Sequence, residues 1–155
     1  MANKQPASGI SCRRVTTIPE FVEAIRIRVD VFIIEQHCPP GWEPDPEDRN
    51  ADHFIALVDD VVVATARLRR DRPGSRKIER MAVRGKNRGC GVGAELTKHV
   101  IQSVRDDGCH RLWLQAQVQA SGFYQRLGFR AISGEYDFHG LNIPHTTMEY
   151  HPLKA

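Results

Sequence analysis

The sequence lacks the features that would indicate a nucleic-acid-binding, membrane or secreted protein. Its net charge of +3 over 155 residues is too small to predict nucleic-acid binding, and its 22 Lys and Arg residues are spread along the chain. No apolar run approaches the length of a membrane span, and residues 1–10 are polar, unlike a signal peptide. We therefore expect a cytoplasmic protein that binds neither nucleic acid nor membrane.

The four cysteines form no C-x-x-C pair; they are Cys12, Cys38, Cys90 and Cys109. Such pairs supply zinc ligands or redox-active thiols, so we expect no metal site and reduced, structural thiols.

A chain of 155 residues predicts a single domain that buries roughly two thirds of its unfolded surface. We expect residues 1–10 to be disordered and residues 11–155 to form this domain.

Hydrophobic periodicity and turn residues predict an α/β order of elements with a central mixed sheet. The predicted strands are 11–16, 53–58, 61–68, 78–83, 111–117, 130–132 and 146–150, and the predicted helices are 17–34, 92–108 and 119–127. The first helix carries Phe21, Ile25, Val29 and Phe32 at helical spacing, which predicts that these side chains face the core. Residues 37–52 hold four prolines and predict a long loop with a short helix.

The glycine-rich run Arg84–Ala94, RGKNRGCGVGA, lies between a predicted strand and a predicted helix. The first turn of a helix leaves backbone N–H groups without intrahelical partners, and the helix dipole adds partial positive charge there. Glycines let a ligand approach those amides closely. The run therefore predicts a phosphate-binding loop.

Two common nucleotide sites fit this run poorly. A P-loop requires a Gly-Lys-Ser/Thr sequence, and none follows Gly93. Gly89, Gly91 and Ala94 satisfy the dinucleotide pattern G-x-G-x-x-A, but that fingerprint needs an acidic residue about 20 positions later to bind ribose. The chain has Trp113-Leu-Gln there, and several predicted strands rather than one precede the glycines. These departures disfavour a nicotinamide site.

Two motifs together resemble the GNAT (Gcn5-related) N-acetyltransferase family. Arg88-x-x-Gly91-x-Gly93 is similar to that family's coenzyme A pyrophosphate loop, and GFYQRLGF at 122–129 resembles its tyrosine helix. The resemblance covers the chain from about Arg13 to Tyr150. Within the family, the chain resembles in particular a subgroup of small, mostly uncharacterised bacterial acetyltransferases. Its early R-x-x-V-F-x-x-E-Q motif appears as Arg28, Val31, Phe32, Glu35 and Gln36, and its late G-x-x-I-P-H motif as Gly140, Ile143, Pro144 and His145.

The resemblance implies a single-domain GNAT-like fold, a central mixed β-sheet with helices on both faces. A splayed parallel strand pair, 78–83 and 111–117, would form the coenzyme A cleft. The resemblance also implies acetyl-CoA as acyl donor and no metal. Residues implied to bind the donor are Met81, Val83, Arg88, Gly89, Cys90, Gly91, Val92 and Gly93, with Arg84 and Lys86 near the phosphates.

The implied reaction is acetyl transfer to a primary amine of a small molecule or peptide, by direct attack in a ternary complex. An alkylammonium must first lose a proton, which costs about 4.6 kcal/mol at pH 7. Glu79 is the first candidate for the base, and His53 and His145 are alternatives because imidazole titrates near neutrality. Tyr124, a phenol that is protonated near pH 7, matches the family's general acid for the departing thiolate.

The acceptor is not readable from the sequence. Glu35 and Trp42 are candidate substrate-binding residues, and the acidic stretch from Glu43 to Asp52 either attracts a cationic amine or is simply solvated. A second hypothesis is a non-catalytic acyl-CoA sensor. A third is an enzyme like the acyl-homoserine lactone synthases, suggested by Arg28, Phe32, Trp42 and Arg67, although that family lacks the glycine loop. Either a monomer or a homodimer is expected.

Overall fold

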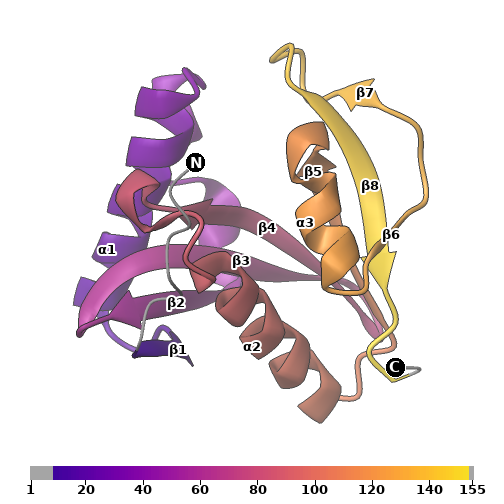
Figure 1. Ribbon diagram of the computed structural model, residues 1–155, viewed down its shortest axis with the longest axis horizontal. Helices are drawn as coiled ribbons and strands as arrows, with labels where there is room; N and C mark the ends of the chain where they lie inside the picture. The colour runs from indigo at the N-terminus through magenta and orange to yellow at the C-terminus, as the bar shows by residue number, and fades with distance from the viewer. Residues whose placement is uncertain (1–8, 154–155) are drawn as a thin grey trace. The chain divides into compact units, whose positions relative to one another are not determined.

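The computed structural model describes residues 9–153, which pack as two compact units (Figure 1). Within the described range, the first unit comprises residues 9–68 and 80–100, and the second comprises residues 69–79 and 101–153. A long strand, β4 (Ser75–Val83), and a long helix, α2 (Val92–Asp106), each contribute to both units. The strand that the sequence predicted from residue 11 begins at Ile10, and residues 1–8 lie outside the described range.

The first unit contains the N-terminal strands and helix. Its elements are β1 (Ile10–Arg14), α1 (Ile18–Arg28), η1 (Val29–Glu35), η2 (Pro40–Trp42), η3 (Pro46–Asn50), β2 (Asp52–Val58), the start of β3 (Val61–Arg72), η4 (Gly85–Asn87) and the first residues of α2. β1 and β3 both pair antiparallel with β2. Asp59 and Asp60 have positive φ angles of 50° and 64° and make the predicted hairpin turn.

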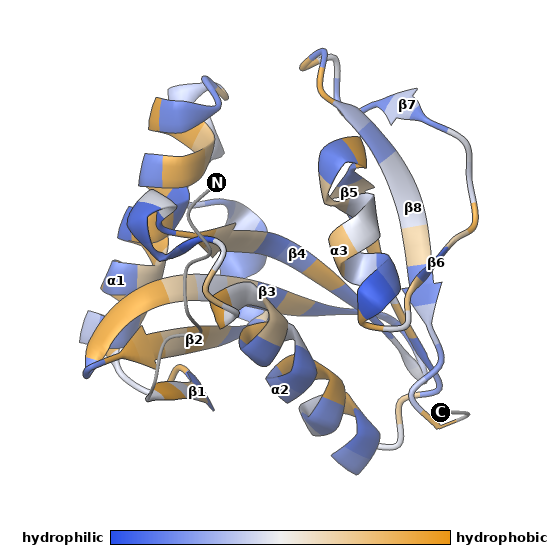
Figure 2. Cartoon of the chain, in the orientation of Figure 1, coloured by the Kyte–Doolittle hydropathy of each residue, from blue (hydrophilic) through white to orange (hydrophobic). Residues whose placement is uncertain are grey.

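Helices cover both faces of the first unit's sheet, as two neighbouring residues of β2 show. His53 packs edge-on against Phe21 of α1 with ring centroids 5.0 Å apart, whereas Phe54 packs against His99 of α2 at 5.8 Å. Successive strand residues point to opposite faces, so each helix covers one face. This explains why β2 reads as an apolar run rather than an alternating one, as its colouring in Figure 2 shows.

The second unit completes the mixed sheet. Its remaining elements are β5 (Arg111–Gln117), η5 (Val118–Ala120), α3 (Ser121–Arg126), β6 (Arg130–Ala131), β7 (Tyr136–Asp137) and β8 (Pro144–Tyr150). Strands hydrogen-bond in the order β1-β2-β3-β4-β5-β8-β6, with β7 on β8. β4 and β5 are parallel with a register from Ser75↔Arg111 to Ile78↔Leu114, and both strands continue beyond it. The predicted α/β fold with a mixed sheet is therefore confirmed.

The prediction for the buried side of the first helix was wrong for Phe21, Ile25 and Val29, whereas Phe32 packs against the core residues Ile27, Val31 and Ala82. Its buried residues are Ala24, Ile27 and Arg28, followed by Val31 in η1, while Phe21, Ile25 and Val29 are only partly buried. Two features explain the error. A buried arginine is invisible to a hydrophobicity pattern, and η1 is a π-helix, in which Gln36 N–H donates to the Val31 carbonyl and the helical period changes.

Gly128 ends α3 as predicted, with a φ of +99°. A Cβ atom at this position would lie 2.8 Å from Cε2 of Tyr150, so a side chain is excluded by contact as well as by backbone conformation. The same glycine releases the chain from α3 into β6.

We expect Gly128→Ala to lower the free energy of unfolding by at least about 2 kcal/mol, because alanine adds both left-handed strain and this clash. Chemical denaturation monitored by circular dichroism measures the change. Gly134→Ala is the matched control, since a Cβ there meets nothing within 4 Å. Equal stability of the two variants would contradict the account of this turn.

Candidate active site

The glycine run forms an open cradle at the start of α2. Gly89 and Gly91 have positive φ angles of 73° and 87°, and a Cβ at either would meet nothing within 4 Å. Gly91 immediately precedes α2, and its carbonyl accepts the hydrogen bond of Glu95 N–H at 3.0 Å. The backbone bends into the helix through conformations that favour glycine, and it leaves space in front of the helix end.

This helix end has the properties of an anion site. The N–H groups of the first helical turn have no intrahelical acceptors, and the helix dipole is positive there. Val92, Leu96 and Val100 are buried and hold the helix against the core. Val92 can therefore take part in binding through its backbone, since its side chain is used in packing. A phosphate group fits the cradle by charge and by the open space at Gly89 and Gly91.

Arg88 links the cradle to two other segments. Its Nε donates to the Val83 carbonyl at the end of β4 at 2.9 Å, and its Nη2 donates to Glu35 at 2.8 Å. The structure thus brings Glu35 to Arg88, which lies 53 residues later in the sequence, and to the end of β4 at Val83. Glu35, expected to bind the acceptor, lies beside the glycine loop. Cys90 is partly exposed, and its thiol contacts the Arg88 carbonyl at 3.5 Å.

Arg84 is turned toward the N-terminal helix. Its guanidinium donates to Asp30 at 2.5 Å and lies 3.9 Å from Glu23. Its backbone N–H donates to the Val63 carbonyl of β3 at 2.9 Å. This residue ties the start of the glycine run to α1 and β3.

Arg80 has an unusual conformation within β4. Its φ is +53°, a left-handed value that costs a non-glycine residue about 1–2 kcal/mol. Its Nε lies 2.6 Å from Glu43 Oε1, its Nη2 donates to Asp45 at 2.8 Å, and its guanidinium lies over the Trp42 ring, 5.5 Å from the centroid. Trp42, a candidate substrate-binding residue, therefore packs against an arginine of the strand that leads to the glycine loop.

A buried charge cluster surrounds Arg80. We define it as Arg28, Glu43, Asp45, Asp48, Arg67 and Arg80. Asp48 accepts hydrogen bonds from Arg28 at 2.7 and 3.0 Å and from Arg67 at 2.9 Å, and Arg28 also pairs with Glu43. Three acidic residues of the 43–52 stretch are thus neutralised inside the protein. Neither sequence interpretation, attraction of an amine or plain solvation, describes these three.

His53 lies at the edge of the charge cluster. Its Nε2 donates to the main-chain carbonyl of Asp48 at 3.0 Å, and its ring packs against Phe21. Only 8% of the residue is exposed. These contacts give His53 a structural role in joining β2 to η3.

Tyr124 is buried in α3 of the second unit. Its ring packs edge-on against Phe123 and Phe129, with centroids 4.9 and 5.7 Å apart. Burial raises the pKa of the phenol above its ordinary value, so Tyr124 stays protonated across the physiological range. A protonated phenol is suited to donating a proton.

Glu79 is surrounded by cations. Its carboxylate lies 2.9 Å from Arg69 Nε and 2.8 Å from Lys77 Nζ. Lys77 also donates to Gln115 at 2.7 Å and lies over the Trp113 ring. Two adjacent cations therefore hold the carboxylate in ion pairs.

His145 has the features of a neutral base. Its Nδ1 donates to the Ile143 carbonyl at 2.7 Å, and its ring stacks on Phe138 with centroids 4.4 Å apart. That hydrogen bond places the proton on Nδ1 and leaves the Nε2 lone pair available. Burial lowers the pKa of the imidazole. His145 is paired with Gln117 at the end of β5, and α3 with Tyr124 begins four residues after that position.

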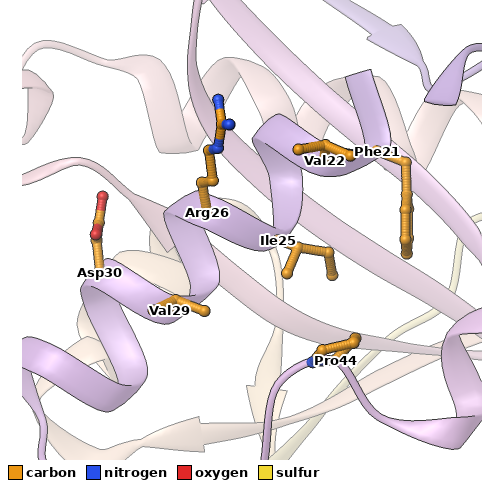
Figure 3. A pocket seen from close by; sticks show the side chains of 7 residues that line it. All are labelled: Phe21, Val22, Ile25, Arg26, Val29, Asp30 and Pro44. Carbon is orange, nitrogen blue, oxygen red and sulfur yellow. The ribbon is translucent and has the colours of Figure 1, made fainter. Parts of the chain in front are cut away.

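An apolar hollow of about 370 Å³ lies along α1 (Figure 3). Seven residues line it: Phe21, Val22, Ile25, Arg26, Val29, Asp30 and Pro44. Phe21, Ile25 and Val29, three of the four residues that the sequence assigned to the core, therefore line this hollow.

The Acetyltransferase (GNAT) domain family matches residues 21–152, most of the chain. The chain belongs to the GNAT family. The uncharacterized N-acetyltransferase YjcF of Bacillus subtilis is 32% identical over 126 residues, which cover 81% of this chain and 89% of YjcF. The expectation of a GNAT acetyltransferase is confirmed.

Solved structures share the GNAT fold. Escherichia coli ElaA has a TM-score of 0.81 at 24% identity and covers 92% of this chain and 99% of its own. An acyl-CoA N-acyltransferase from Pseudomonas aeruginosa has a TM-score of 0.75 at 26% identity and covers 90% of this chain and 97% of its own. GNAT acetyltransferases use acetyl-CoA, and the cradle at Gly89 and Gly91 suits its pyrophosphate.

Two further features of this GNAT chain concern membrane spans and metal ions. No helix between residues 9 and 153 is long and apolar enough to cross a membrane. Within the same range, no group of three or more His, Cys, Asp or Glu residues is placed to hold a metal ion.

Sequence reasoning missed the charge cluster of this GNAT domain and the left-handed Arg80. One signal was available, because Arg67 lies between Ala66 and Leu68 in an otherwise apolar strand. Such an arginine needs a buried acidic partner. The acidic stretch 43–52 contains such partners, Asp45 and Asp48.

The charge cluster makes the free energy of unfolding depend on pH in the acidic range. Burial opposes ionisation of Asp48, but hydrogen bonds from Arg28 and Arg67 outweigh it and lower its pKa to about 2. An unfolded aspartate has a pKa of about 3.9. Stability from Asp48 is therefore present above pH 4 and is lost as the pH falls toward 2. Glu149, whose pKa is also lowered to about 2, adds to the loss.

We expect Asp48→Asn to lower the free energy of unfolding at pH 7 by about 3 kcal/mol and to flatten its decline between pH 4 and pH 2. Urea denaturation across this pH range measures both effects. Asp59→Asn in the exposed β2–β3 turn is the control and should keep the wild-type slope. Identical acid slopes in wild type and Asp48→Asn would show that the cluster does not set the acid limit.

Proposed function

We propose that this protein transfers an acetyl group from acetyl-CoA to a primary amine of a small molecule or peptide, by direct attack in a ternary complex. The observation that carries the proposal is the open glycine cradle at the start of α2, joined through Arg88 to the end of β4. Backbone N–H groups of the cradle would bind the pyrophosphate. The β4 backbone at Met81 and Val83 would pair with the pantetheine amides, as an added strand would.

His145 is the base that the side-chain environments favour. Its Nε2 lone pair is available at neutral pH, because Nδ1 carries the proton and burial disfavours the charged imidazolium. Glu79 is held between Arg69 and Lys77, and His53 packs against Phe21 beside Asp48, where its ring joins β2 to η3. We assign His145 to remove a proton from the acceptor ammonium before attack on the thioester carbonyl.

Tyr124 is assigned as the proton donor to sulfur. As the C–S bond breaks, the thiolate of coenzyme A takes the phenolic proton, which prevents reversal of the reaction. The raised pKa keeps the Tyr124 phenol protonated before the C–S bond breaks. A backbone N–H of β4 would stabilise the oxyanion that forms on the thioester carbonyl.

The decisive experiment is a thiol-release assay with acetyl-CoA against polyamines, amino sugars, amino acids and lysine peptides. At least one amine should release coenzyme A above the rate of acetyl-CoA hydrolysis. An enzyme that binds acetyl-CoA but leaves the whole panel unreacted would overturn catalysis and favour an acyl-CoA sensor.

For the donor site, we expect Gly91→Glu to weaken acetyl-CoA binding at least tenfold in isothermal titration. The substitution strains a residue at φ +87° and places a carboxylate where the phosphates would bind. Gly140→Glu is the matched control, because its φ is +72° and its Cβ position is also open. Wild-type affinity in the Gly91→Glu variant would rule out the glycine cradle as the donor site.

For the proton transfers, we expect Tyr124→Phe and His145→Asn each to lower kcat about 100-fold or more, with acetyl-CoA affinity unchanged. Wild-type activity should fall below pH 6.5 as His145 is protonated, because its pKa lies below the ordinary value of 6.5. His145→Asn should lose that acidic limb in kcat/KM profiles. A variant that keeps the limb would transfer the base role to another residue.

A further inference from the structure

Arg80 differs from every other left-handed side chain in the described part of the protein. Its φ of +53° occurs inside a strand, β4. The other non-glycine residues with positive φ lie in turns and loops; they are His37, Asp59, Asp60, His139 and Asn142. A strained residue inside a strand persists only where its surroundings hold it.

Arg80 is held by one short segment, Trp42–Asp45. Glu43 and Asp45 take its guanidinium from two sides, at 2.6 and 2.8 Å, and the Trp42 ring lies against it. The side chain of Glu43 is fully buried, and the side chain of Arg80 is only 17% exposed. The guanidinium is therefore fixed, and with it the residue that carries it.

The Trp42–Asp45 segment is itself anchored from two other elements. Glu43 pairs with Arg28 of α1, and Asp45 accepts a hydrogen bond from Arg67 of β3 at 2.7 Å. Asp45 also caps η3, where its side chain accepts from Glu47 N–H at 2.8 Å. The grip on Arg80 is thus part of a rigid framework rather than of a loose loop.

We propose that Trp42–Asp45 holds Arg80 in its left-handed conformation and thereby positions the β4 backbone at Met81–Val83 for acyl-CoA. A left-handed residue turns the next peptide out of the regular strand alternation, so Arg80 decides where the Met81 N–H points. Arg80 is a positioning residue, because its side chain faces the acidic segment. That acyl-CoA is the ligand rests on the proposed function. That Trp42–Asp45 holds Arg80 in its left-handed conformation does not.

Alanine and glycine at position 80 separate positioning from other roles. Both substitutions remove the guanidinium, but glycine adopts positive φ at no cost whereas alanine does not. We expect Arg80→Ala to weaken acetyl-CoA binding about tenfold in isothermal titration and Arg80→Gly to stay within about threefold of wild type. Asp60→Ala and Asp60→Gly, the same pair at another left-handed position, should both bind like wild type.

Crystal structures of the ligand-free proteins supply a second, independent readout. Position 80 should have positive φ in wild type and in Arg80→Gly, and negative φ in Arg80→Ala. Retained positive φ in Arg80→Ala, or equal affinities of the Ala and Gly variants, would overturn the inference. Failure of the wild type to bind acetyl-CoA would overturn the proposed function, while the conformational comparison would still decide whether the acidic segment holds Arg80.

Discussion

The buried charge cluster is the interaction on which the first unit depends. A charge removed from water is costly unless partners of opposite sign replace the lost hydration. Here each buried arginine meets at least two carboxylates, and the sum of charges over Arg28, Arg67, Arg80, Glu43, Asp45 and Asp48 is zero. The cluster joins the proline-rich segment to α1, β3 and β4, so a stretch with little regular structure is fixed at its centre.

In the same unit, arginine side chains pair with carboxylates, while backbone groups of the glycine run face the open cradle. Arginine side chains near β4 are used for internal pairing: Arg80 with the cluster, Arg84 with Asp30, and Arg88 with Glu35. The backbone of the glycine cradle and the helix dipole behind it have the properties of an anion site. Binding through amides, as we propose, would explain why the spacing of glycines, rather than a count of basic residues, predicts the site in the sequence.

The sequence predicted elements whose determinants are local. The Asp59-Asp60 turn, the start of α2 at Val92 and the glycine end of α3 each depend on a few adjacent residues. It did not predict the buried face of α1, because Arg28 is buried only through partners 15 and 20 residues away, Glu43 and Asp48. Nor did it predict the conformation of Arg80, which depends on a segment 35 residues earlier.

Ion pairing also decides which groups are suited to proton transfer. Carboxylates that lie beside arginine or lysine, such as Glu149, are stabilised in the ionised form and hold protons weakly. A base for an ammonium near neutral pH needs a lone pair that is not already stabilised by a cation. An imidazole stacked on Phe138 meets that requirement, and a buried phenol supplies the complementary acid. In a chain rich in arginine, we therefore propose His145 and Tyr124, rather than the more numerous carboxylates, for the proton transfers.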